Sequence, residues 1–311
     1  MRVAAIDVGT NTTRLLIAET NDRTERYRSL ERRLVFTRLG EGVDSRRRLE
    51  KTSIERTCKA ITSFCAICGE FDVQELRIAA TSAVRDASNP DDFLGPVAKI
   101  AGIAPTILSG EQEASLSFTG AVFDLPVGRY LVSDIGGGST EYISGNSSVP
   151  ELAQGVSLDI GSVRLTERFL RSDPPSSEEM ETLIESIDEA LPGIDPVAAD
   201  AAAFVGVAGT VTSLAAVLLG LEDYDPLQTH HFRMTRASVE DLLNQLAGMT
   251  LADRLQLPSL PKGRADVIVA GAAILAGSMR HWGFRELIVS ERDILDGLVL
   301  ELIHDLSRES S

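Results

Sequence analysis

Short apolar runs open the chain, and a helical period follows them. The runs are brief and alternate with polar positions, so they read as three strands joined into an antiparallel meander. The helical period places isoleucines and three cysteines along one helix near residues 50–70. The three strands are expected at residues 3–8, 14–19 and 26–38.

Strands and helices alternate through the rest of the chain. Such alternation after an opening meander predicts an α/β fold with mixed β-sheets flanked by helices. The expected strands lie at residues 75–80, 105–108, 129–134, 140–145, 151–157, 203–207 and 286–290. The expected helices lie from about residue 90 and at residues 110–122, 159–170, 176–191, 209–219, 237–247, 263–280 and 293–305.

The strand pattern restarts near residue 129 in the style of the N-terminal meander. The segment from Asp124 to Gly128, which includes Pro126, supplies turn residues just before this restart. We therefore expect two domains, at residues 1–124 and 125–311. The last helix could pack against the first domain.

The charge balance narrows the choice of partners. The chain has 311 residues, of which 43% are hydrophobic, and its 30 basic and 46 acidic side chains give a net charge of −16. This charge disfavours broad binding to nucleic acid or to an anionic membrane. A polyanionic substrate would need local arginines and bound cations to reverse the field around it.

The apolar segments predict no membrane partner. Asp7 interrupts the N-terminal apolar stretch before a signal sequence can form, and the longest apolar tract, Val267–Gly277, is too short to span a bilayer. We expect a cytoplasmic protein. In that reducing compartment Cys58, Cys65 and Cys68 are expected to be buried thiols, because no second ligand pair completes a metal site.

Two similar loops carry the strongest chemical signal. Each follows an apolar run with an aspartate, then one glycine or three, then hydroxyl side chains, and the two aspartates are 134 − 7 = 127 positions apart. Such a turn exposes backbone N–H groups that can hold a phosphate, and its aspartate can hold a hydrated cation. Ordinary hairpin turns are the alternative for either loop alone. The loops are Asp7-Val8-Gly9-Thr10-Asn11-Thr12 and Asp134-Ile135-Gly136-Gly137-Gly138-Ser139-Thr140-Glu141.

Two more segments offer a base and an anion-binding arginine. Glu113 lies in the first turn of an expected helix, where acidic residues also suit the helix dipole, so a catalytic and a structural role are equally favoured. Ser109 and Gln112 have the spacing of a capping box for this helix. Arg85 follows the strand at 75–80, where it can bind phosphate together with backbone N–H groups or lie in solvent.

Three further features have open roles. Gly206–Thr210 follows a strand and could bring the backbone close to a ligand or simply turn the chain. His230 and His231 lie in an expected loop or strand, and we assign them no catalytic part. Several arginines near the N-terminus could meet a long anion or lie on a solvated surface, namely Arg32, Arg33, Arg38, Arg46, Arg47 and Arg48.

These segments together resemble a known family. The chain resembles, over nearly its full length, the exopolyphosphatase / guanosine pentaphosphate phosphohydrolase family of the sugar kinase/Hsp70/actin superfamily. The resemblance rests on the two glycine loops and on four other stretches in the family's order. These are Thr81-Ser82-Ala83-Val84-Arg85-Asp86, Ser109-Gly110-Glu111-Gln112-Glu113-Ala114, Gly206-Val207-Ala208-Gly209-Thr210 and Ser290-Glu291-Arg292-Asp293-Ile294-Leu295-Asp296-Gly297.

The resemblance implies a fold and a site. It implies two actin-like (ribonuclease H-like) domains, each a mixed sheet flanked by helices, with the site in the cleft between them. Glu113 is then the catalytic base and Arg85 the arginine that binds phosphate. Asp134 and Glu141 lie nearest to Mg²⁺, with Asp7 in the corresponding place of the first loop. The phosphate-binding residues are Gly9, Thr10, Asn11, Thr12, Gly136, Gly137, Gly138 and Ser139.

The implied activity is hydrolysis of a terminal phosphoanhydride. The first expectation is an exopolyphosphatase acting on short or medium chains of inorganic polyphosphate, because longer relatives have a helical C-terminal region that this chain lacks. A guanosine pentaphosphate (pppGpp) 5′-phosphohydrolase is the alternative on the same scaffold. An actin-like nucleotide-binding or kinase module is a more distant one. The resemblance also allows a homodimer.

Overall fold

The computed structural model describes residues 1–20, 27–194 and 200–309, and the first residue of the strand expected at 26–38 lies outside them. The chain forms two compact units. Unit 1 contains Met1–Gly120 and Ile294–Ser311, and unit 2 contains Ala121–Asp293. Both termini therefore belong to unit 1, and each unit is built around its own β-sheet.

The sheet of unit 1 has five strands in the order β3-β2-β1-β4-β5. The first three form the predicted antiparallel meander, and β4 and β5 continue the sheet in parallel with β1. The strands are β1 (Arg2–Val8), β2 (Thr12–Thr20), β3 (Tyr27–Phe36), β4 (Glu75–Ala80) and β5 (Thr106–Ile107).

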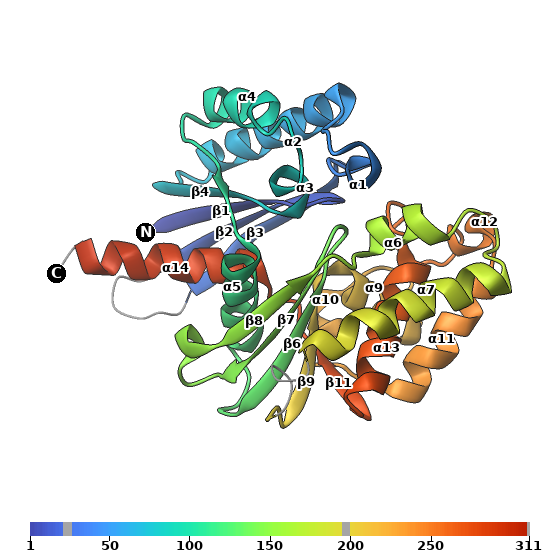
Figure 1. Cartoon of the computed structure of the whole chain (residues 1–311). Coiled ribbons are helices and arrows are strands. Elements are labelled where there is room, and N and C mark those ends of the chain that lie inside the picture. Colours follow the sequence, from blue (N-terminus) through green and yellow to red (C-terminus); the bar gives the residue numbers. More distant parts are fainter. Residues whose placement is uncertain (21–26, 195–199, 310–311) are drawn as a thin grey trace. The chain divides into compact units, whose positions relative to one another are not determined.

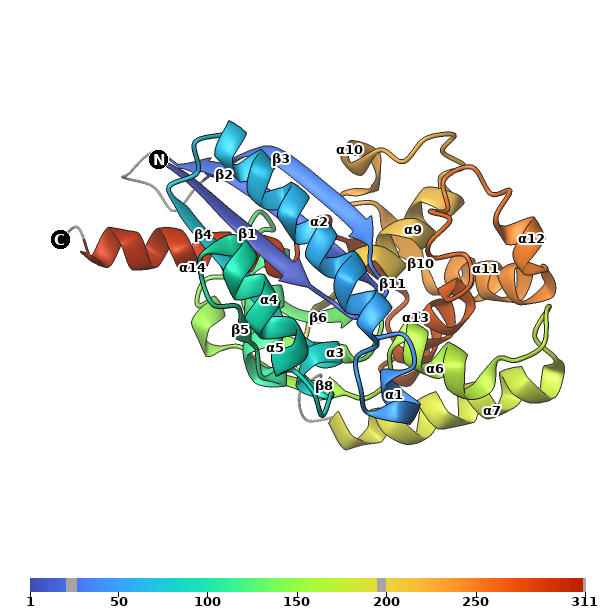
Figure 2. The same ribbon diagram turned by 90° about the horizontal axis from the view of Figure 1, so that it is seen from above.

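Helices cover both faces of this sheet because successive side chains on a strand point to opposite sides. Ala4 and Ile6 of β1 belong to the core beneath α2, whereas Val3 and Ala5 belong to the core beneath α14. Figure 2 shows α2 and α4 lying side by side over the strands. The helices of unit 1 are α1 (Val43–Arg46), α2 (Lys51–Glu70), α3 (Ser82–Arg85), α4 (Asp91–Ala101), α5 (Gly110–Val122, which continues into unit 2) and α14 (Ile294–Glu309).

The sheet of unit 2 repeats this strand order. Its order is β10-β11-β9-β6-β7-β8, so β8-β7-β6-β9-β11 correspond one by one to β3-β2-β1-β4-β5. The directions agree as well: β6, β7 and β8 are antiparallel, and β9 and β11 run parallel with β6. The strands are β6 (Arg129–Ile135), β7 (Thr140–Asn146), β8 (Gln154–Leu158), β9 (Ala203–Val207), β10 (Arg233–Thr235) and β11 (Glu286–Val289).

A group of helices builds the core of unit 2. Figure 1 shows α7, α13 and α11 packed side by side against the sheet. The hydroxyl groups of Tyr142 on β7 and Ser278 on α13 are hydrogen-bonded at 2.6 Å, and the Tyr142 ring lies edge-on to that of Trp282. The helices are α6 (Ser162–Phe169), α7 (Ser177–Ala190), α9 (Ala208–Leu218), α10 (Pro226–Thr229), α11 (Arg236–Gly248), α12 (Leu251–Arg254) and α13 (Ile268–His281), with short 3-10 turns at Pro150–Leu152 and Leu191–Ile194.

The predicted fold class, α/β with two mixed sheets flanked by helices, is confirmed. The apolar tract Val267–Gly277 lies in α13, whose side chains from Ile268 to Met279 are buried in the core of unit 2. The predicted start of this helix, residue 263, was wrong, because α13 begins at Ile268. The residues before it form successive turns, in which Arg264 donates its N–H to the Pro261 carbonyl and Val267 donates to the Arg264 carbonyl. In the part of the chain that the structure describes, no helix combines the length and the apolar character needed to cross a membrane.

The cysteines lie on α2, as the helical period predicted. All three are free thiols, with Cys68 buried and Cys58 and Cys65 half-buried. Burial raises the pKa of all three thiols, that of Cys68 to about 12. Such thiols are poor nucleophiles and poor metal ligands at neutral pH.

Candidate functional site

The two glycine loops have the same hydrogen-bonded turn. Gly9 donates its N–H to the carbonyl of Thr12 at 2.9 Å, and Gly136 donates to the carbonyl of Ser139 at 3.0 Å. Each loop joins two antiparallel strands at the same place in its sheet. The offset of 127 positions seen in the sequence is therefore an equivalence in three dimensions.

One equivalent pair of positions differs in charge. Asp7 lies opposite Arg14 in the β1–β2 ladder, and Asp134 lies opposite Glu141 in the β6–β7 ladder. The guanidinium of Arg14 donates to Asp7 Oδ2 at 2.7 Å from Nη2 and at 3.0 Å from Nε. The first loop thus contains an ion pair in the place where the second contains two carboxylates.

The two carboxylates of the second loop suit a hard cation. Asp134 is 7% exposed and Glu141 is 1% exposed, and Glu141 accepts a hydrogen bond from Ser157 Oγ on β8 at 2.6 Å. Like charges directly opposite each other on neighbouring strands repel, and a divalent cation relieves that repulsion. An all-oxygen set of donors is the one that Mg²⁺ prefers. Asp134 and Glu141 therefore fit Mg²⁺, and Asp7, already paired with Arg14, is the weaker of the three predicted ligands.

A neighbouring segment fixes the shape of the first loop. Gly40 donates its N–H to the carbonyl of Thr10 and Arg38 donates to the carbonyl of Asn11, both at 2.9 Å. The hydroxyl groups of Thr10 and Ser82 lie 2.9 Å apart in the buried interior. A Cβ at Gly40 would lie 2.4 Å from Thr10 Cγ2, so the segment can approach this closely only with glycine.

The start of α6 fixes the second loop in an analogous way. Ser162 donates its N–H to the carbonyl of Gly136 at 2.9 Å, and Arg164 donates its Nε–H to the carbonyl of Gly138 at 2.5 Å. A Cβ at Gly161 would lie 2.4 Å from the carbonyl oxygen of Gly137. Glycine is needed at position 161 for this close approach.

Glu113 and Arg85 are brought together. Glu113, 8% exposed, lies in the first turn of α5, and Arg85 ends the four-residue helix α3 that follows β4. The Nη1 group of Arg85 donates to Glu113 Oε2 at 2.9 Å and to the carbonyl of Leu108 at 3.0 Å. The capping box predicted for α5 is also present, because Ser109 and Gln112 exchange two hydrogen bonds. Arg85 is therefore an ion-paired side chain rather than a solvated one.

The backbone at Gly206–Thr210 turns beneath an arginine. A Cβ at Gly209 would lie 1.6 Å from the guanidinium carbon of Arg264, whose Nη1 donates to Ser213 Oγ at 3.1 Å. Ala208, next to it, has a positive φ of 63°. An arginine of the same unit therefore packs closely on this backbone, and the approach of the segment to a ligand stays a prediction.

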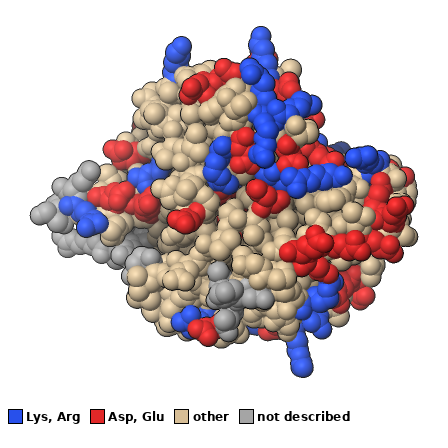
Figure 3. Space-filling view, viewed as in Figure 1, with Lys and Arg blue, Asp and Glu red and all other residues tan. Residues whose placement is uncertain are grey.

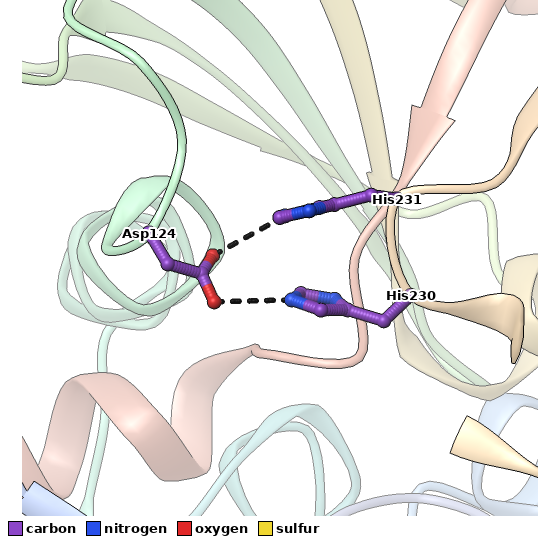
Figure 4. Close-up of side chains that lie close together, drawn as sticks. All are labelled: Asp124, His230 and His231. Carbon is purple, nitrogen blue, oxygen red and sulfur yellow. Dashed lines mark hydrogen bonds and ion pairs between the residues drawn. The ribbon is translucent and has the colours of Figure 1, made fainter. Parts of the chain in front are cut away.

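Asp124, His230 and His231 form a hydrogen-bonded cluster in unit 2 (Figure 4). Their ligand atoms lie within 4.8 Å of one another, a spacing that a metal ion could use. His230 Nδ1, however, accepts the N–H of Glu291 at 3.1 Å, so its ring proton is on Nε2, 3.0 Å from Asp124 Oδ2. Arg292 also donates to this oxygen, at 2.6 Å. A metal on His230 Nε2 would displace a proton that Nδ1 cannot accept while it accepts the Glu291 N–H, so these hydrogen bonds disfavour a metal at His230.

Most of the N-terminal arginines have acidic partners within unit 1. On the face seen in Figure 3, acidic and basic side chains lie next to one another. The pairs of Arg33, Arg46 and Arg48 lie at the surface and contribute little to stability, whereas Asp296, the partner of Arg32, is buried. The pairs are Arg32–Asp296, Arg33–Glu31, Arg46–Glu50 and Arg48–Asp92.

Sequence reasoning missed three arginines of these loops: Arg14, Arg164 and Arg264. For Arg14 a signal existed, because 14 + 127 = 141 places it in register with Glu141. Arg164 and Arg264 lie in segments whose pattern does not reveal which way a long side chain points.

The chain is similar to known proteins over nearly its whole length. A model of the Ppx/GppA phosphatase family matches residues 16–306. Exopolyphosphatase 2 of Mycobacterium tuberculosis is 40% identical over 316 residues, which cover 97% of this chain and 98% of that protein. A crystal structure of an exopolyphosphatase-like protein has a TM-score of 0.92 and 33% identity, covering 98% of this chain and 100% of that one. A Ppx/GppA family member from Aquifex aeolicus has a TM-score of 0.82 and 30% identity, covering 100% and 99%. The chain therefore belongs to the Ppx/GppA phosphatase family.

Proposed function

We propose that this protein is an exopolyphosphatase, which releases the terminal phosphate of inorganic polyphosphate by Mg²⁺-assisted hydrolysis. The relative at 40% identity over nearly the full length of both chains carries that name. The structural observation that carries the proposal is the 2.9 Å ion pair between Glu113 and Arg85. It joins the residue expected to act as base to the residue expected to hold the transferred phosphoryl group.

When substrate binds, Arg85 exchanges part of its interaction with Glu113 for hydrogen bonds to the terminal phosphate. A terminal phosphate accepts hydrogen bonds from Arg85, whose planar guanidinium suits phosphate oxygens. Arg85 then shares its charge with the substrate, and Glu113 Oε2 becomes available to a water molecule. Glu113 orients this water for in-line attack and accepts its proton as the new O–P bond forms and the bridging P–O bond breaks. The leaving group is the polyphosphate chain shortened by one unit.

The loops and the carboxylates balance the negative charge. Backbone N–H groups of the glycine turns bind phosphate oxygens, which is also how an acidic protein can hold a polyanion. Mg²⁺, when bound, would neutralise charge on these oxygens, and Asp134 and Glu141 would hold it. That both loops act on one polyphosphate end remains a prediction. Double-variant cycles between Asn11 and Ser139 would test it through the Michaelis constant.

The test is release of phosphate from several substrates side by side. Purified protein with Mg²⁺ would be incubated with polyphosphates of graded length, with guanosine pentaphosphate and with ATP. We expect the largest kcat/KM on a polyphosphate. A larger value on guanosine pentaphosphate would favour the other activity in the family's name, and release only from ATP, or none, would contradict the proposal.

A further inference from the structure

Residues of α6 donate hydrogen bonds to three carbonyl groups of the second glycine loop, those of Gly136, Gly137 and Gly138. Gly136 accepts from the Ser162 amide at 2.9 Å and from Ser162 Oγ at 3.2 Å. Gly137 accepts from the amides of Val163 and Arg164, and Gly138 accepts from the Arg164 side chain. The first turn of α6 and one guanidinium therefore bind three consecutive carbonyls.

This pattern fixes the direction of the loop's N–H groups. In a planar trans peptide the C=O of one residue and the N–H of the next point in opposite directions. The three bound carbonyls thus turn the N–H groups of Gly137, Gly138 and Ser139 away from α6. Among the described residues none accepts a hydrogen bond from these three N–H groups, although Ser139 is only 2% exposed. Buried N–H groups are almost always paired in proteins, which points to an external acceptor.

We propose that Arg164 is a positioning residue that holds the peptide between Gly138 and Ser139 in the orientation that presents the Ser139 N–H to a phosphate oxygen. The inference rests on the proposed function only in naming the ligand as a phosphate. Arg164 does not touch the substrate in this account, and it acts through the carbonyl of Gly138.

The burial of Arg164 supports this role. It is 5% exposed, and its Nη2 lies 3.4 Å from Asp159 Oδ1, whose side chain is 76% exposed. Keeping a buried guanidinium is costly unless good geometry repays the cost. The amides of Ser162, Val163 and Arg164 bind the first two carbonyls, but the third depends on this side chain. Glycine at 138 allows the peptide to rotate once that bond is lost, since no Cβ restricts its backbone.

The test combines phosphate binding with an amide signal for each loop residue. Inorganic phosphate would be titrated into ¹⁵N-labelled protein while the amide resonances of Gly137, Gly138 and Ser139 are followed. Arg164→Met keeps the aliphatic volume and removes the donor, and Arg164→Lys keeps the charge without the Nε–H. The matched control is Arg254→Met, because Arg254 is 4% exposed and donates to another backbone carbonyl, that of Ala265, at 3.0 Å.

We expect phosphate to shift all three amides in the unsubstituted protein. Both Arg164 variants should lose the Ser139 shift and bind phosphate about 10-fold more weakly, with kcat/KM on the substrate reduced about 10- to 100-fold, while Arg254→Met keeps the shift. Unchanged phosphate binding in the Arg164 variants, or an equal loss in Arg254→Met, would overturn the inference. If the unsubstituted protein shows the amide shifts but hydrolyses no phosphoanhydride, the proposed function fails and the positioning role stands. If phosphate shifts none of the amides, the positioning role fails.

Discussion

The charge difference between the two glycine loops leads to a prediction about metal binding. Asp7 and Asp134 occupy equivalent positions, but Asp7 faces Arg14 and Asp134 faces Glu141. Replacing each aspartate with asparagine makes the same chemical change in two matched places. Only the change at Asp134, and the companion change Glu141→Gln, should weaken Mg²⁺ binding strongly.

The expected size follows from electrostatics. Two unit charges about 4 Å apart interact by about 4 kcal/mol at an effective dielectric constant of about 20, and a divalent ion doubles this to about 8 kcal/mol. The amide side chain of each variant keeps one oxygen that can bind Mg²⁺, and water screens much of the lost electrostatic attraction. Changes to groups that only support a ligand already weaken metal binding about 10- to 100-fold. We therefore expect about 100-fold weaker Mg²⁺ binding, about 2.8 kcal/mol, for Asp134→Asn and Glu141→Gln. For Asp7→Asn we expect less than about 5-fold, because Arg14 already neutralises Asp7.

Calorimetric titration of Mg²⁺ without substrate measures this directly, and the Mg²⁺ dependence of phosphate release gives a second value. Melting temperatures of the three variants separate a loss of metal binding from a loss of folding. An Asp7→Asn variant that loses as much Mg²⁺ affinity as Asp134→Asn would contradict the neutralisation of Asp7 by Arg14. Mg²⁺ binding that is unaffected by Glu141→Gln would contradict the role of Glu141 as a ligand.

Three further predictions concern packing and pH. Gly161→Ala places a Cβ 2.4 Å from the Gly137 carbonyl oxygen, so it should separate α6 from the loop and reduce kcat/KM at least about 10-fold, measured beside Gly193→Ala, which has open space. Gly297→Ala places a Cβ 2.0 Å from the Leu116 carbonyl oxygen and should lower the free energy of unfolding by about 1–3 kcal/mol in urea titrations; an unchanged midpoint would contradict that close packing. Burial alone would raise the pKa of Asp124, but hydrogen bonds from His230 and Arg292 outweigh it and lower this pKa. Its stabilising contribution is thus present above the unfolded-state pKa of about 3.9 and decreases as pH falls toward the lower folded pKa. The stability difference between the unsubstituted protein and Asp124→Asn should therefore shrink below about pH 4, and a difference that grows there would show the opposite sign.

Much of the architecture could be predicted because its signals are local. The meander of β1, β2 and β3 and its repeat in β6, β7 and β8 were visible as short alternating runs, each with an aspartate and at least one glycine at the first turn. Elements of three or four residues, such as α12 and β10, were missed because a periodic pattern cannot be recognised over so few positions. The start of α13 was misplaced because the residues before it continue its apolar pattern while forming turns.

The chemistry of the site depended on contacts between distant segments. Glu113 and Arg85 are 28 positions apart, and their ion pair follows from the places of α3 and α5 in the fold. In the sequence Arg164 is one more polar residue of an expected helix. Its role follows only from the contact between the start of α6 and the glycine loop. No local pattern reveals which of 30 basic side chains points into the interior.

In the proposed reaction this chain hydrolyses a terminal phosphoanhydride with Glu113 as the base. Phosphate release from inorganic polyphosphate in Mg²⁺, compared between the unsubstituted protein and Glu113→Gln, tests this most directly. We expect release by the unsubstituted protein and a rate about 10²- to 10⁴-fold lower in the variant, with Mg²⁺ binding and melting temperature little changed. A Glu113→Gln variant that releases phosphate at nearly the unsubstituted rate would contradict this role of Glu113.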